Sequence, residues 1–210
     1  MLLIKNTCQL KQSSDEGDLL PPLFKRGDGC VNTRERILKA AQEAFAKKGF
    51  NGVSMEEIAK AAGVKKALIY YYFPSKENLF EEVWTRTIDE IEESLFKEVE
   101  NEKSYMRKLK KFLRSYIDFV TNKTVLMELI EKEGSSIVEE EKWENLRRKY
   151  DGFLSKMASI IAEGKRYNAI YDDIDPVAAA NLISSSITPG KKGMLNNILS
   201  MIIRGILKEN

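Results

Sequence analysis

The segment SMEEIAKAAGVKKALIYYYFPSK, residues 54–76, contains the strongest structural pattern in this chain. Ser54 followed three residues later by Glu57 forms a capping box, so a helix is predicted to begin here. Gly63 then tolerates the positive φ that a tight turn requires. A second short helix is predicted over 65–72. Two short helices around a tight turn are typical of a helix-turn-helix unit, whose second helix lies in the DNA major groove.

The second helix of this unit carries a basic face rich in tyrosine hydroxyls. Its lysines are either solvated surface charges or contacts to DNA, and we favour contacts because phosphate neutralisation drives affinity for DNA. Leu68 is expected to meet a thymine methyl group, or else to pack against the first helix. Tyr70 can be a packing residue with its hydroxyl at the surface. Tyr72 and Phe73 are open to the same interpretation as scaffold.

Two runs of sequence resemble a known family. TRERILKAAQEAFAKKGF (33–50) and SMEEIAKAAGVKKALIYYYFPSKENLF (54–80) are similar to the N-terminal domain of the TetR family of bacterial transcriptional repressors. Downstream, only EGKRYNAIYDDIDPVAAANLI (163–183) is similar to family sequences. The resemblance implies an all-α homodimer. Its first three helices would bind double-stranded operator DNA, and its larger C-terminal domain would bind a small-molecule effector and dimerise.

The resemblance also implies roles for particular residues. Ser54 would cap its helix and donate to phosphate, the start of the recognition helix would contact base edges, and tyrosines and a lysine further on would touch phosphate. Two positions depart from the family pattern, because Lys65 stands where Ser is often the N-cap and Ala67 where Gly or Pro is frequent. The DNA-binding residues expected on this basis are Ser54, Lys65, Lys66, Ala67, Leu68, Tyr70, Tyr71, Tyr72 and Lys76.

Helical periodicity extends on both sides of this unit. Asn32 is the expected cap of a first helix that ends at Lys47-Lys48-Gly49, and Ser75 caps a long fourth helix. Apolar residues then recur at helical spacing to the end of the chain. We predict an all-α fold with a tail over 1–31, a helix-turn-helix domain over 32–78 and a helical ligand-binding and dimerisation domain over 79–210. The helices expected within the last domain cover 104–121, 124–133, 138–164, 176–187 and 193–208.

Composition narrows the function classes. The 210 residues carry a net charge of +2, but residues 31–78 hold nine basic and five acidic side chains, a net charge of +4, which favours one domain that meets a polyanion. Histidine is absent, which removes the usual catalytic imidazole and most metal sites, so we predict no enzyme, no metal and no cofactor. Two cysteines without CxxC spacing favour a reduced, cytoplasmic compartment. No run reaches the roughly 20 apolar residues of a membrane-spanning helix.

The larger domain offers less specific signals. Aromatic and methionine side chains at helical spacing are usually core, but the family binds apolar ligands between these helices, so some are expected to line a pocket. Those candidates are Trp84, Phe112, Tyr116, Phe119, Met127, Ile130, Phe153 and Met157. The acidic residues Glu128, Glu131 and Glu133 either face solvent or meet a cationic ligand. A broad apolar face over 198–207 needs to be covered, and the resemblance to the family implies that the last two helices form the homodimer interface. Thr188-Pro189-Gly190 interrupts the first of these two helices.

These expectations leave two functions to separate. The first is a repressor released from its operator by a small hydrophobic or amphipathic ligand. The second is a ligand-independent DNA-binding architectural or partner-recruiting protein of the same fold. A pocket in the larger domain favours the first function, and a filled core favours the second.

The first 30 residues are expected to be dispensable. They contain Pro-Pro, scattered Gly and balanced charge, so they gain too little burial to offset their ordering entropy. Val31 can be encoded by GTG, and Lys25-Arg26-Gly27-Asp28 can be encoded by a sequence like a ribosome-binding site, which suggests a start assigned too early. The alternative is an arm that enters the minor groove.

Overall fold

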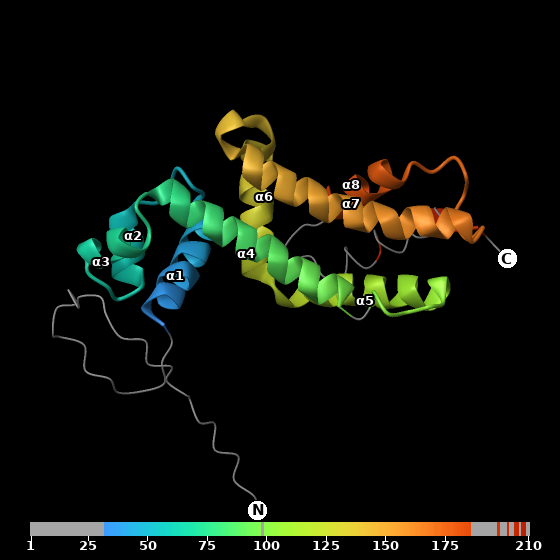
Figure 1. The fold of residues 1–210 in the computed structure, drawn as a ribbon, viewed down its shortest axis with the longest axis horizontal. Coiled ribbons are helices and arrows are strands. Elements are labelled where there is room, and N and C mark those ends of the chain that lie inside the picture. The colour runs from blue at the N-terminus through green and yellow to red at the C-terminus, as the bar shows by residue number, and fades with distance from the viewer. Residues whose placement is uncertain are drawn as a thin grey trace, which may run out of the picture. The chain divides into compact units, whose positions relative to one another are not determined.

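A computed structural model describes residues 32–97, 99–185, 197, 201, 204–205 and 207–208 (Figure 1). In this part of the chain the regular elements are helices, which confirms the all-α prediction. The predicted tail, Thr188-Pro189-Gly190 and most of the predicted terminal helix over 193–208 lie outside the described residues. Leu207, which was expected in the apolar face of that helix, forms an isolated antiparallel β-bridge with Ile170.

The first three helices begin at the predicted caps. They are α1 (Thr33–Lys48), α2 (Met55–Ala61) and α3 (Lys66–Tyr72). The Asn32 side chain accepts a hydrogen bond from the Arg34 amide at 3.1 Å. Ser54 Oγ accepts from the Glu57 amide at 3.2 Å, and the Glu57 carboxylate accepts from the Ser54 amide at 2.9 Å, so the capping box is complete. Gly63 has φ +65°, as the tight turn requires.

The remaining helices are α4 (Lys76–Phe96), α5 (Tyr105–Asn122), α6 (Thr124–Glu139), α7 (Glu144–Arg166) and α8 (Pro176–Ser185), with a 3₁₀ turn, η1 (Glu141–Trp143), between α6 and α7. Two predicted boundaries are wrong. Helix α6 continues through Gly134 to Glu139 instead of ending at 133, and α7 begins at Glu144 instead of 138. The helical conformation is interrupted at Glu140. In the 3₁₀ turn that follows, the Trp143 ring is 3% exposed and lies in the core.

One hydrophobic core extends from the helix-turn-helix unit into the larger domain. Helix α1 packs against both α4 and α6 (Figure 1). The Phe50 ring, in the connection after α1, lies 5.0 Å from the Phe80 ring of α4 and 5.3 Å from the Trp143 ring, measured between centroids. Phe45 of α1 meets Phe80 edge to face at 5.2 Å. These aromatic contacts join elements that are far apart in the sequence.

Two tyrosine hydroxyls hold the end of α8 against the larger domain. Tyr116 of α5 donates to the Ile183 carbonyl at 2.7 Å, and the Tyr150 hydroxyl of α7 shares a hydrogen bond of 2.7 Å with Ser184 Oγ. Burial raises the pKa of Tyr116 well above its ordinary value, so this hydroxyl keeps its proton. Helix α8 is therefore positioned by side chains of the core.

Two glycines of α7 give a matched test of this packing. A Cβ on Gly164 would lie 2.2 Å from the Tyr105 hydroxyl and 2.7 Å from Ile170 Cδ1, whereas a Cβ on Gly152 would meet nothing within 4 Å. We expect Gly164→Ala to lower the free energy of unfolding by about 1–3 kcal/mol through overpacking. Gly152→Ala should raise it by about 0.5–1 kcal/mol, since Ala favours the helix. Urea denaturation measures both, and equal effects of the two substitutions would contradict the packing.

Candidate nucleic-acid interface

Helix α3 presents most of its predicted contact residues to solvent. Lys65, Lys66 and Ala67 are exposed, and the Tyr70 and Tyr71 side chains are 43% and 73% exposed. On the opposite side of the helix Ile69 is fully buried, and Phe73, directly after the helix, is 2% exposed. This helix therefore holds a basic and tyrosine-rich face outward on a fixed apolar base, while Leu68 and Tyr72 lie partly buried at its edges.

The two lysines at the start of α3 differ in their surroundings. Lys66 Nζ lies 3.4 Å from the Glu56 carboxylate of α2, and both side chains are well exposed. An exposed ion pair of this kind contributes only about 0–1 kcal/mol, so DNA phosphate or a base edge can replace Glu56 at little cost. Lys65 occupies the N-cap position and makes no side-chain capping bond, as its departure from the family pattern implied.

The acidic residues of α2 are partly neutralised. Lys48 Nζ donates to the Glu57 carboxylate at 2.7 Å, and this bond, with those from Ser54, lowers the pKa of Glu57 to about 2. Glu57 therefore stays ionised at all physiological pH values. Its negative charge is compensated by the hydrogen bonds of the capping box and by the Lys48 ammonium. Ser54 remains exposed beside it.

Lys76 has a structural role that sequence reasoning missed. Its Nζ donates to the carbonyls of Phe50 at 2.9 Å and Val53 at 3.1 Å, and it lies 4.3 Å from the centroid of the Phe50 ring. Two of the three ammonium protons are thus used to hold the connection between α1 and α2. A phosphate contact by Lys76 stays a prediction, and it could use only the remaining proton.

Arg36 of α1 is a second positioning residue that the sequence analysis did not identify. Its guanidinium donates to the carbonyls of Ala62 at 2.6 Å and Gly63 at 3.2 Å, at the turn between α2 and α3. A Cβ on Gly63 would lie 2.9 Å from this guanidinium. The turn therefore needs glycine for its positive φ and also for the space that Arg36 occupies. No local sequence pattern could have indicated a contact across 26 residues.

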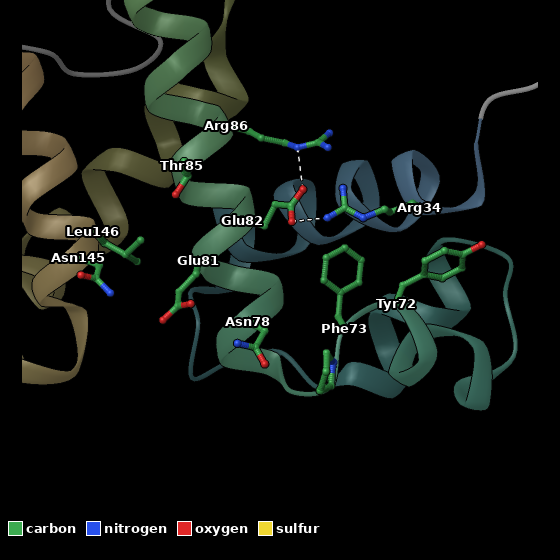
Figure 2. A pocket seen from close by; sticks show the side chains of 11 residues that line it. Arg34, Tyr72, Phe73, Asn78, Glu81, Glu82, Thr85, Arg86, Asn145 and Leu146 are labelled. Atoms are coloured by element: carbon green, nitrogen blue, oxygen red, sulfur yellow. Dashed lines mark hydrogen bonds and ion pairs between the residues drawn. The ribbon is translucent and has the colours of Figure 1, made fainter. Parts of the chain in front are cut away.

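Helix α4 is tied to α1 beside a surface hollow of about 500 Å³ (Figure 2). Arg34 and Arg86 both point toward Glu82 and form ion pairs with it, that of Arg86 at 3.0 Å. Arg86 also donates to both Glu35 carboxylate oxygens at 2.8 Å. The hydrogen bond from Arg34 lowers the pKa of Glu82, so the carboxylate stays charged. The hollow borders the α3–α4 junction at Phe73 and the start of α7.

The predicted effector residues share the core of the larger domain. All are buried except Ile130, which is partly buried. Neither this hollow nor a second one, lined by Ala46, Lys47, Glu128, Glu131 and Lys132, includes any of them. Trp84 Nε1 is buried without a hydrogen-bond partner among the described residues. The candidate residues, on α4, α5, α6 and α7, are Trp84, Phe112, Tyr116, Phe119, Met127, Ile130, Phe153 and Met157.

The described residues include no group of three or more Cys, Asp and Glu side chains placed to hold a metal ion. Within the same residues, no helix combines the length and the apolar character that crossing a bilayer requires.

Comparisons with known proteins place this geometry in a family. The family model for bacterial regulatory proteins of the tetR family matches residues 37–83, which contain α2, α3 and most of α1. The HTH-type transcriptional repressor NicS of Pseudomonas putida is 30% identical over 163 residues, which are 76% of this chain and 76% of NicS. The chain belongs to the TetR family. Its relatives are transcriptional regulators and not enzymes.

Solved structures confirm the fold expected of a TetR-family chain. The ketosteroid transcriptional regulator KstR2 of Mycobacterium tuberculosis aligns with a TM-score of 0.69 at 17% identity, covering 86% of this chain and 98% of KstR2. AibR, solved in complex with isovaleryl coenzyme A and operator DNA, aligns with a TM-score of 0.67 at 18% identity, covering 81% of this chain and 96% of AibR. At these identities the alignments speak for the architecture alone.

Stability measurements can distinguish Lys76, which holds backbone carbonyls, from Lys65, which is exposed. Lys76→Met should lower the free energy of unfolding by about 1.5–3 kcal/mol, because it removes charge-assisted bonds to two carbonyls. Lys65→Met should leave stability within about 0.5 kcal/mol of the parent, as for other exposed positions. Urea denaturation checks both variants. A Lys76→Met protein as stable as Lys65→Met would show that the bonds to Phe50 and Val53 are not formed in solution.

Proposed function

We propose that this TetR-family regulator is a homodimeric repressor that acts on DNA in the cytoplasm and is released from its operator by a small hydrophobic or amphipathic ligand. The outward basic and tyrosine-rich face of α3 on a buried apolar base carries the DNA-binding half of this proposal. The repressor assignment draws support from NicS, a repressor by name. The effector assignment draws support from AibR, which was solved with isovaleryl coenzyme A and operator DNA.

In this proposal the start of α3 reads bases and its tyrosines position the protein on the backbone. Lys66 can release Glu56 and turn to a base edge, and Leu68 and Ala67 can face thymine methyl groups. The proposed donors to phosphate are Ser54, Tyr70, Tyr71, Tyr72 and the remaining proton of Lys76. Lys65, which the resemblance placed with the base-reading residues, stands at the N-cap before α3 and is proposed here to contact phosphate instead.

The homodimer is proposed to form through α8 and the terminal helix predicted from the sequence over 193–208. The outer face of α8 exposes Val177 by 57% and Leu182 by 53%, and large apolar side chains at a surface are suited to burial by a partner. A two-fold axis would then place two α3 helices about 34–36 Å apart, the spacing of successive major grooves.

Neither surface hollow reaches the predicted effector residues, so the filled core around them favours the ligand-independent alternative. The effector half of the proposal therefore requires that the apolar core between α4 and α7 open to admit a ligand. Trp84 Nε1 is a buried donor that leaves one hydrogen bond unmade, which favours a ligand that carries an acceptor atom on an otherwise apolar body. Helix α4 connects this region to α3 through Phe73-Pro74-Ser75. A ligand that shifts α4 would therefore move the recognition helix, and linkage requires that it prefer the conformation that does not bind DNA.

Selection of bound sequences from random DNA tests the DNA-binding half. We expect an inverted repeat, and with that operator Lys66→Ala should relax preference at one base pair by about 1–3 kcal/mol. Lys65→Ala should instead weaken binding to all sequences and reduce the salt slope by about one unit. Uniform loss of affinity in both variants would assign Lys66 to phosphate rather than to a base.

Fluorescence tests the effector half, because Trp84 and Trp143 are the two tryptophans of the chain. In a Trp143→Phe variant, effectors should change the emission of Trp84 and should lower operator affinity at the same ligand concentration. Trp84→Phe should weaken ligands that carry an acceptor more than ligands that carry none, by about 1–3 kcal/mol for the lost hydrogen bond. A ligand that binds tightly but leaves operator affinity unchanged would contradict the coupling for that ligand.

A further inference from the structure

Two adjacent side chains of α6 hold the end of α1. Lys132 Nζ donates to the Lys47 carbonyl at 2.7 Å, in the last turn of α1. The Glu133 carboxylate, on a side chain that is 6% exposed, accepts a hydrogen bond from the Phe50 amide at 2.9 Å. Helix α6 therefore bonds to the chain on both sides of Gly49, across more than 80 residues of sequence.

The backbone between these two bonds is shaped to receive the carboxylate. Gly49 has φ +75°, and a Cβ built on it would lie 2.8 Å from Glu133 Oε1. Only glycine adopts this positive φ without strain and also avoids a steric clash with the Glu133 carboxylate. The contact is thus a fitted one in which Gly49 leaves room for the carboxylate and Phe50 supplies its donor.

Because Glu133 is buried, its hydrogen bond with the Phe50 amide restricts where the two groups can lie. A carboxylate removed from water is costly unless it keeps hydrogen-bond donors, so Glu133 constrains where the Phe50 peptide can lie. Met127 and Ile130, which belong to the proposed effector region, lie six and three residues before Glu133 on the same helix. A displacement of α6 at those residues would therefore reach α1 directly, without passing through α4.

We propose that Glu133 is a positioning residue through which α6 sets the placement of the DNA-binding domain. This inference rests on the proposed function and adds to it a second connection, from α6 to the α1–α2 segment, beside the α4 connection at Phe73-Pro74-Ser75. Glu133 contacts no DNA in this account. It determines how the two recognition helices of a dimer are spaced, and not how each one reads its half-site.

The test compares Glu133→Gln, which keeps an acceptor for the Phe50 amide, with Glu133→Met, which has similar size and no such acceptor. Glu131→Met is the matched control, because Glu131 lies on the same helix and is exposed. Amide hydrogen exchange at Phe50 should quicken about tenfold in Glu133→Met, as expected for one lost hydrogen bond. It should stay at the parent rate in Glu133→Gln and Glu131→Met.

The second readout is DNA affinity. Glu133→Met should weaken binding to the complete inverted repeat and leave binding to a single half-site unchanged, whereas Glu133→Gln should bind both like the parent. Gly49→Ala should have the same effect as Glu133→Met, because the Cβ on residue 49 would displace the Glu133 carboxylate. If one of these two variants fails to fold, the other still tests the proposal.

Unchanged Phe50 exchange in Glu133→Met, or equal loss for half-site and complete operator, would overturn the proposal. The exchange measurement needs neither DNA nor effector. A failure of the chain to bind any selected DNA would thus contradict the proposed function and would still leave the Glu133 contact tested by itself.

Discussion

The peptide groups around Phe50 are held from two sides, and the placement of the DNA-binding domain depends on this constraint. Glu133 of α6 accepts the Phe50 N–H, and Lys76 of α4 donates to the Phe50 carbonyl. Each hydrogen bond to a charged group is worth about 1.5–3 kcal/mol. The Phe50 ring adds contacts with Phe80 and Trp143. The connection between α1 and α2 is thus fixed by helices of the larger domain.

This arrangement explains how a small unit of three helices can report on the rest of the chain. Helix α3 packs against α2, and Arg36 hydrogen-bonds to the turn between them. Helix α1 packs against α4 and α6. The ion pairs Arg34–Glu82 and Arg86–Glu35 add further ties between α1 and α4. In the proposed function a ligand bound in the larger domain would change DNA affinity, and it could do so only through contacts that differ between two conformations.

Local signals in the sequence were sufficient for the helix-turn-helix unit. The Ser54 and Glu57 capping box, the positive φ of Gly63 and the uncapped start at Lys65 involve residues close in sequence, and each is found as predicted. The bonds of Lys76 and Glu133 join residues separated by 26 and 83 positions, and no periodicity marks them. The predicted end of α6 at 133 lies just before Gly134, Ser135 and Ser136, whose intrinsic helix propensity is low. The helix continues through these residues, with Glu133 and Ile137 buried on either side.

Differential scanning calorimetry of Phe50→Ala, at fixed protein concentration, tests most directly whether Phe50 joins the two domains. The account predicts one cooperative transition for the parent protein and two for Phe50→Ala, with the DNA-binding domain unfolding first. Phe153→Ala, which removes a ring of the same size from the core of the larger domain, should keep one transition at lower temperature. A single transition in Phe50→Ala, shifted like that of Phe153→Ala, would contradict the account.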